Sequence, residues 1–223
     1  LKILHALATT EFASVEQHQP WINQGPTAED RFIQVQITAD GAHQGFINTR
    51  LLRTFGPEAS KKADELLELR IGEHPIDAFN VLFELGDVVG FCFCMDLVAW
   101  YHLHAMLNCS YAPLATDMTS MVHEGKFHAS FGARRARDLS LKADYQIVTK
   151  AGREENQAAV DKSIYALDTF GKTGLNFANL SVTYGIRKWN NEELLAKYKE
   201  EIDKKIAAIG LVVRPEGKER KIL

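Results

Sequence analysis

The sequence predicts an all-α protein built around a four-helix bundle with additional helices. Two observations predict this fold class. First, no stretch of the 223 residues sustains the alternation of apolar and polar side chains that marks a half-buried strand. Second, apolar residues recur at helical spacing in several long segments, most of which end at proline or glycine. Because such helices bury their apolar faces against one another, a bundle is the expected architecture.

The first two helices are predicted from their ends. Residues 1–19 have apolar side chains at helical spacing and end before a proline. Pro26 and Thr27 open a long second helix, in which Asp30 stands three residues after Thr27 as in a capping box. Residues 55–57, Phe-Gly-Pro, close it. The predicted buried stripe of this helix consists of Ile33, Ile37, Phe46, Ile47, Leu51 and Leu52.

The central helix is predicted to be a core element. After a short charged helix over residues 58–70, it is expected to begin at Pro75 or Asp77 and to run to Leu107. It is apolar on nearly every face, which is typical of a helix surrounded by other helices. Ionisable residues interrupt it more often than a lipid-facing span tolerates, so we expect no membrane partner.

A fourth bundle helix begins at Pro113 and reaches Leu139, after which the sequence becomes polar. Residues 158–170 are amphipathic, and a final helix with an apolar stripe is expected over residues 191–209, ending at Gly210. The predicted domains are therefore a ferritin-like bundle core, residues 1–140, and a C-terminal helical extension, residues 141–223, packed on the same domain.

Composition and charge narrow the functional class. Hydrophobic residues make up 46% of the chain and charged residues 25%, as in ordinary soluble proteins. The formal net charge of -3 provides no basic field, so we expect no nucleic-acid partner. Three cysteines, two of them in an apolar run, favour buried reduced thiols over a disulfide framework. Together with the lack of a signal-like segment, these thiols predict a cytoplasmic protein.

Acids and histidines recur on the predicted bundle helices. Asp40 and His43 are three residues apart and share a helix face, and Glu124 and His128, four apart, also share one. Asp96 lies among apolar neighbours, so its carboxyl group must be protonated, paired or metal-bound. Its pairing with a histidine needs no metal.

With an acid on the first helix, these residues form the carboxylate layout of ferritin-like proteins, in which the bundle helices supply ligands to a central site. Carboxylates and imidazoles suit iron or manganese. The candidate metal ligands are Glu11, Asp40, His43, Asp96, Glu124 and His128.

Two further groups of residues are weaker candidates. Arg134 and Arg135 are expected near the end of the fourth helix, where they complement its dipole. They are also candidates for binding the phosphates of an anionic substrate, although a solvated face is the more ordinary interpretation. His102 and His104 are two residues apart and face different directions, so we interpret them as packing residues.

The order of several landmarks along the chain is more specific than any single motif. They are Trp21-Ile22 with Pro26, Asp40 to His43, Phe55-Gly56, Gly86 to Val88 with Asp96, Glu124 to Gly132, Lys188 to Asn191, and Ala208 to Leu211. In this order the chain resembles, from about Thr10 to Leu211, the phenylacetic acid degradation family, and in particular the catalytic subunit of bacterial ring-1,2-phenylacetyl-CoA epoxidase.

This resemblance implies a ferritin-like fold and a carboxylate-bridged di-iron centre. In that family the centre activates dioxygen and inserts one oxygen atom into the ring of an aromatic acyl-CoA, with electrons from a separate reductase. A related, metal-free subunit supports the active one. By position, Glu11, His43, Asp96 and His128 match iron ligands of the family.

The chain departs from the family pattern at two ligand positions. Asp40 stands where the family has glutamate, and its side chain is shorter by one methylene. Gly125 stands where the family has the glutamate ligand of the fourth helix, and Glu124 matches a neighbouring acid that is not a ligand.

Three functions remain open from the sequence. The first is a phenylacetyl-CoA epoxidase-like di-iron oxygenase of phenylacetate catabolism with a degenerate metal site, which if active is an O2-dependent monooxygenase acting on an aromatic acyl-CoA. The second is a non-catalytic structural subunit of a multicomponent complex, with partner subunits and a reductase. The third is a mononuclear-metal or small-molecule-binding protein that uses two histidines and a carboxylate. A homodimer is also expected, because so apolar a bundle often has a further face to cover.

Overall fold

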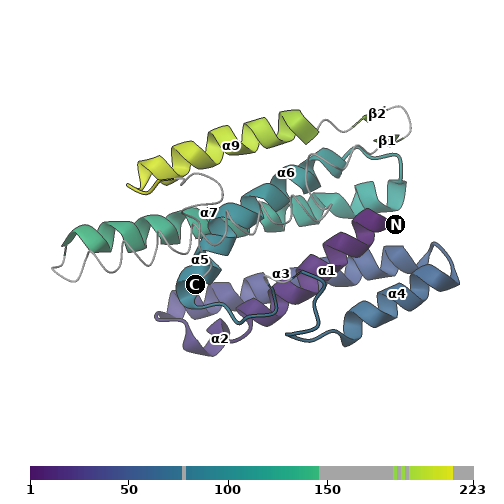
Figure 1. The fold of residues 1–223 in the computed structure, drawn as a ribbon, viewed down its shortest axis with the longest axis horizontal. Coiled ribbons are helices and arrows are strands. Elements are labelled where there is room, and N and C mark those ends of the chain that lie inside the picture. Colours follow the sequence, from purple (N-terminus) through teal and green to yellow (C-terminus); the bar gives the residue numbers. More distant parts are fainter. Residues whose placement is uncertain (77–78, 146–182, 185–186, 189–190, 213–223) are drawn as a thin grey trace. The chain divides into compact units, whose positions relative to one another are not determined.

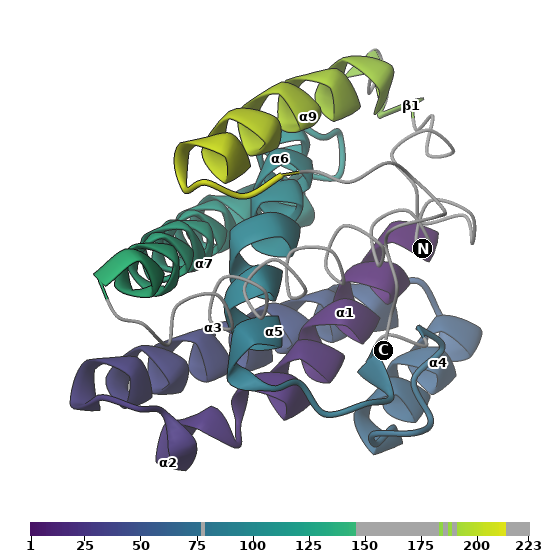
Figure 2. The same cartoon turned by 60° about the vertical axis from the view of Figure 1, so that its left-hand side comes forward.

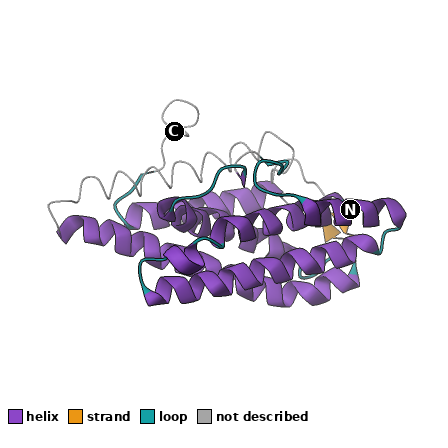
Figure 3. Cartoon of the chain, turned by 90° about the horizontal axis from the view of Figure 1, so that it is seen from below, coloured by secondary structure: helices purple, strands orange, loops and turns teal. Residues whose placement is uncertain are grey.

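The computed structural model describes residues 1–76, 79–145, 183–184, 187–188 and 191–212 (Figure 1). Helices dominate this described part, and its only strands are the two-residue β1 (Thr183–Tyr184) and β2 (Arg187–Lys188), which pair antiparallel (Figure 3). The all-α prediction is therefore confirmed.

The chain divides into two compact units, Leu1–Leu85 and Gly86–Leu223. The division into residues 1–140 and 141–223 stays a prediction. The amphipathic segment 158–170 lies outside the described residues.

The first unit is built on α1 (Lys2–His18) and α3 (Ala28–Arg53), with the short α2 (Trp21–Gln24) between them in sequence. α1 and α3 lie side by side (Figures 1 and 2). A Cβ atom added at Gly45 would lie 2.8 Å from a ring atom of Phe12, a distance that side chains do not tolerate. Glycine at this position therefore permits the close approach of the two helices.

The N-terminus of α3 has the predicted capping box. Asp30 N–H donates to Thr27 Oγ1 (3.0 Å), and Thr27 N–H donates to the Asp30 carboxylate (3.2 Å). The predicted stripe is buried except at Phe46, where the prediction is wrong because the ring is 57% exposed. Phe46 precedes the buried Ile47, and the helical step of about 100° between them turns its ring away from the stripe. Gly56, at φ 100°, then provides the left-handed turn into α4 (Pro57–Glu68).

The predicted start of the central helix is also wrong, because the helix begins at Leu85 rather than at Pro75 or Asp77. The preceding loop is held by side chains of α1 and α2. Gln17 lies at the centre of this contact.

The buried Gln17 amide bonds the loop backbone at two points. Its Nε2 donates to the Phe79 carbonyl (2.9 Å), and its Oε1 accepts from the Phe83 N–H (2.8 Å). Trp21 Nε1 donates to the Phe83 carbonyl (3.2 Å). These bonds satisfy backbone groups that a helix would otherwise pair.

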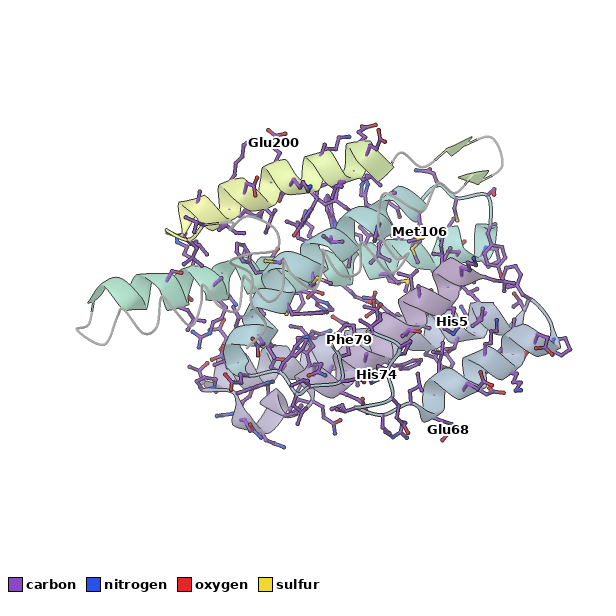
Figure 4. All side chains as sticks on the ribbon, in the orientation of Figure 1. His5, Glu68, His74, Phe79, Met106 and Glu200 are labelled. Atoms are coloured by element: carbon purple, nitrogen blue, oxygen red, sulfur yellow. The ribbon has the colours of Figure 1, made fainter. Side chains whose placement is uncertain are left out.

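A second contact anchors the same loop. His74 and Phe79, both labelled in Figure 4, are buried. His74 Nε2 lies 2.8 Å from a carboxylate oxygen of Glu16 on α1, and the Asn80 side chain bonds the backbone of His74 at both N–H and C=O. These contacts therefore anchor His74 and Asn80 to the first unit.

The second unit contains three successive helical segments and the long helix α7 (Ala112–Tyr145). The successive segments are α5 (Leu85–Gly90), the π-helix η2 (Phe91–Met95) and α6 (Asp96–Met106), and both η2 and α6 pack on α7. A π-helix is a wider turn, found often at functional sites. Here it immediately precedes Asp96.

The closest contact in this unit is between Gly132 of α7 and the backbone of η2. A Cβ atom added at Gly132 would lie 2.7 Å from Phe93 Cα and closer still to Phe93 N and the Cys92 carbonyl carbon. The two helices therefore touch backbone to backbone at this point.

The helix α9 (Asn191–Ala208) packs along α6 (Figures 1 and 2). Tyr198, Ile202 and Ile206 are buried against the second unit's core, which confirms the stripe predicted for this helix. Tyr101 Oη donates to the Glu201 carboxylate (2.6 Å) across the same interface. Gly210, at φ 77°, ends the element as predicted.

Within the described residues, Leu85–Met106 is long and apolar enough to cross a membrane. However, 61% of its apolar window is buried by the rest of the protein. We therefore interpret it as a core helix, as the sequence predicts.

Candidate metal centre

The candidate ligands are divided between the two units. Those of the first unit are Glu11, Asp40 and His43, and those of the second unit are Asp96, Glu124 and His128. Within each unit, the packing of the helices determines which side chains meet.

In the first unit, Glu11 on α1 lies against α3, on which Asp40 and His43 are three residues apart. A Glu11 carboxylate oxygen is 3.8 Å from where a Cβ of Gly41 would lie. Asp40 is buried and accepts a hydrogen bond of 2.6 Å from Gln36 Nε2, one turn earlier. His43 lies on the exposed side of α3.

In the second unit, Asp96 has neighbours from the preceding π-helix η2 and from α7. Its Oδ2 lies 3.9 Å from His128 Nδ1, which is within ion-pair range but too long for a direct hydrogen bond. It also interacts by a side-chain hydrogen bond with the Cys92 thiol, four residues earlier across the π-helix. Sequence reasoning expected a histidine partner for Asp96 but missed Cys92.

The electrostatics of this cluster follow from burial. Desolvation raises the pKa of Asp96, and the nearby His128 and the bond to Cys92 partly oppose this rise. Burial also raises the pKa of Cys92 well above its usual value, with the charge of Asp96 acting in the same direction. The Cys92 thiol therefore stays protonated and acts as a hydrogen-bond donor. Cys92, Cys94 and Cys109 are all buried and free, as predicted.

Position 125 of α7 has an apolar environment. A Cβ atom added at Gly125 would lie 3.6 Å from Leu103 Cδ1 and 4.0 Å from Trp100 Cα, both ordinary contacts. The half-buried Glu124 stands one residue earlier, and His128 is buried three residues later. The neighbours of position 125 on α6 are therefore hydrocarbon rather than charged groups.

The weaker candidates lie further along α7. Arg134 is exposed and Arg135 is half-buried. The helix continues past the predicted end at Leu139 to Tyr145, so both arginines lie more than two turns before its C-terminus. Because the dipole effect falls off within the last turn, the predicted dipole interaction is wrong.

His102 on α6 is half-buried and gives a pH-dependent prediction. Its Nε2 has no solvent contact, and burial lowers the pKa of its imidazole to about 3. Below pH 6.5 the His102 imidazole is protonated in the unfolded chain but not in the folded protein. The free energy of unfolding therefore falls as the pH falls. We expect this histidine to contribute a loss of about 1 kcal/mol per pH unit below pH 6.5.

Urea unfolding of the wild type and of His102→Gln at about pH 7, 6 and 5 checks this expectation. The wild type should lose stability more steeply than the variant. Parallel curves would contradict the assignment.

Within the described part of the chain, no three histidine, cysteine, aspartate or glutamate side chains group closely enough to hold a metal ion. The family model described as "Phenylacetic acid catabolic protein" matches residues 1–221. The chain belongs to this family. The phenylacetic acid catabolic protein family has a ferritin-like, all-α fold, which confirms the fold class expected from the sequence. A search of curated proteins gave no match.

The phenylacetic acid catabolic protein family includes di-iron subunits, and this chain lacks the carboxylate that the resemblance places at position 125. Gly125 has no ligand atom, and a first side-chain carbon at that position would contact Leu103. Asp40 and Asp96 each have a hydrogen-bond partner of their own, in Gln36 and Cys92. His43 lies on an exposed helix side.

Proposed function

We propose that this chain is a non-catalytic, ferritin-like subunit of a multicomponent oxygenase complex in phenylacetate catabolism. The observation that carries the proposal is Gly125, a residue without a ligand atom at the position where the family resemblance places a carboxylate. Its neighbours Leu103 and Trp100 supply no carboxylate in exchange. In this role the chain supports a related catalytic subunit that acts on an aromatic acyl-CoA and receives electrons from a reductase.

The Asp96 cluster supports the same proposal. In a di-iron subunit this carboxylate would bind metal, whereas here the Cys92 thiol and the His128 imidazole are its neighbours. These two neighbours lie beside the carboxyl group without a cation, although Asp96 Oδ2 has no hydrogen-bond partner among the described residues. We further propose that the two units close into the four-helix bundle of the family, and that the protein acts in the cytoplasm.

One observation favours a second candidate function, an oxygenase with an altered iron site. Glu124 is half-buried and lies one turn before His128 on α7, so it is the nearest replacement for the missing carboxylate. The ligands would then be Glu11, Asp40, His43, Asp96, Glu124 and His128, and bound iron would supply the oxidising chemistry. A mononuclear site with two histidines and one carboxylate is the remaining alternative.

Metal analysis of protein expressed in iron-supplemented medium separates these functions. We expect much less than one iron per chain for the wild type. About two irons per chain would overturn the non-catalytic proposal in favour of the oxygenase. About one would overturn it in favour of the mononuclear site.

The substitution Gly125→Glu tests whether the missing carboxylate limits metal binding. It restores a carboxylate at the position, so we expect iron content to rise severalfold. Gly125→Ala is the matched control, because it fills the same space without a ligand atom and should leave the iron content unchanged. Equal iron content in the two variants would contradict the assignment of position 125 as a lost ligand position.

A further inference from the structure

Cys92 is fully buried in the π-helix η2, where α7 fixes the backbone that carries it. A Cβ atom added at Gly132 would overlap the Cys92 carbonyl carbon and the Phe93 nitrogen. The backbones of α7 and η2 therefore touch at this point. Because such dense packing leaves little room for a side chain to change rotamer, the sulfur atom is held in place one turn before Asp96.

The two oxygen atoms of the Asp96 carboxyl group have different surroundings. The group has a side-chain hydrogen bond with the Cys92 thiol, which is the donor because burial raises its pKa well above the usual value. Oδ2 has no hydrogen-bond partner among the described residues, so we assign the thiol to the other oxygen. Oδ2 lies 3.9 Å from His128 Nδ1 on α7. One oxygen is therefore held by the thiol, and the other faces an imidazole nitrogen.

A carboxyl group with one oxygen held in this way is oriented as a metal ligand would be. Carboxylates that bind metal are themselves hydrogen-bonded by neighbouring groups, which fix their direction. Two donors that bind one first-row metal ion at about 2.1 Å each lie no more than about 4.2 Å apart. The 3.9 Å between Asp96 Oδ2 and His128 Nδ1 is within this limit. Both residues belong to the unit Gly86–Leu223, so their spacing does not depend on the other unit.

We propose that Cys92 is a positioning residue, whose thiol holds Asp96 so that Asp96 Oδ2 and His128 Nδ1 are a preformed pair of metal donors. A pair alone binds a metal ion weakly, because protein sites usually supply three or four ligands. The low iron content expected under the proposed non-catalytic function, on which this inference rests, agrees with such a pair. The third donor is missing at Gly125, three residues before His128 on α7.

Cobalt titration in a Gly125→Glu background tests the role of Cys92. This background adds a third donor within the same unit, and Co²⁺ is the probe because its visible absorption reports the ligands around it. Adding Cys92→Ala should weaken Co²⁺ binding about tenfold or more, since the loss of a supporting hydrogen bond typically lowers metal affinity by about 10–100-fold. Cys92→Ser keeps a donor and should recover most of the affinity.

Cys94→Ala in the same background is the matched control. Cys94 is equally buried, and burial alone raises the pKa of its thiol, without a contribution from Asp96. This variant should bind Co²⁺ as tightly as Gly125→Glu alone. Equal binding by the two alanine variants would overturn the proposal, and so would tighter binding by Cys92→Ala, which would show that the thiol competes with the metal.

A Gly125→Glu protein that does not bind Co²⁺ would also overturn the proposal, because a preformed pair with a third donor should bind it. These comparisons do not involve the iron content of the wild type. The proposed function, which that iron content tests, can therefore fail or stand separately from the role of Cys92.

Infrared spectroscopy tests the hydrogen bond without a metal. The S–H stretching band that disappears in Cys92→Ser belongs to Cys92. A hydrogen bond to the Asp96 carboxyl group lowers the frequency of this band, so the band should move to higher frequency in Asp96→Ala. The band of Cys94, assigned in the same way from Cys94→Ala, should not move. A Cys92 band that stays in place would overturn the proposed bond.

Discussion

Replacing Gly132 with alanine is expected to destabilise the protein by about 3 kcal/mol or more. The added Cβ would overlap the backbone of Phe93 and Cys92 rather than a movable side chain. To make room for the added Cβ atom, α7 must move away from the π-helix η2, against which it packs. The midpoint of urea unfolding, followed by circular dichroism, measures this loss.

Gly125→Ala is the matched control on the same helix. Here the Cβ makes only ordinary contacts with Leu103 and Trp100. Because alanine is favoured over glycine in a helix interior, this variant should be more stable than the wild type by about 0.5–1 kcal/mol. The two substitutions are chemically identical, so their opposite signs isolate the contact at Gly132. Equal midpoints in both variants would contradict the backbone contact.

Replacing Gln17 with leucine is expected to cost about 2–3 kcal/mol. Leucine is similar in size but removes both amide bonds to the loop, and it leaves the Phe79 carbonyl and the Phe83 N–H without these partners. Hydrogen exchange should locate the effect. Compared with the wild type, the exchange of the Phe83 amide should be accelerated more than the exchange of amides in α9.

Gln19→Leu is the corresponding control, because Gln19 is exposed at the end of the same helix. This change should alter the free energy of unfolding by less than about 0.5 kcal/mol. A Gln17 variant as stable as the Gln19 variant would show that the loop is not held by the buried amide.

Features fixed by neighbouring residues could be predicted from the sequence. The capping box at Thr27 and the end of the last helix at Gly210 depend on side chains and backbone within a few residues. The loop before Leu85 could not be predicted, because its conformation depends on Gln17, which is distant in sequence. The apolar loop before Leu85 would by its own preference extend the helix. Its backbone instead forms hydrogen bonds with the Gln17 side chain of α1.

The candidate site could likewise be predicted only in part. The apolar surroundings of Asp96 predicted that its carboxyl group needs a partner, and the structure places the His128 imidazole nearby. The contact with the second partner, Cys92, depends on the π-helix, and no hydrophobic periodicity in the sequence indicates a π-helix. Its position four residues before Asp96 was the available signal. Whether the acids and histidines of both units bind iron remains a prediction.

The contact at Gly132 also fixes how α7 can slide. Gly125 is the only other residue of α7 without a Cβ, and it lies seven residues from Gly132, about 10 Å along the axis. If α7 slid along η2 by less than this distance, a side chain of α7 would overlap the η2 backbone. Asp96 and His128 each lie about one turn from this contact and are therefore held in register. A change in metal content caused by a substitution at position 125 thus reports the ligand itself, not a shifted helix.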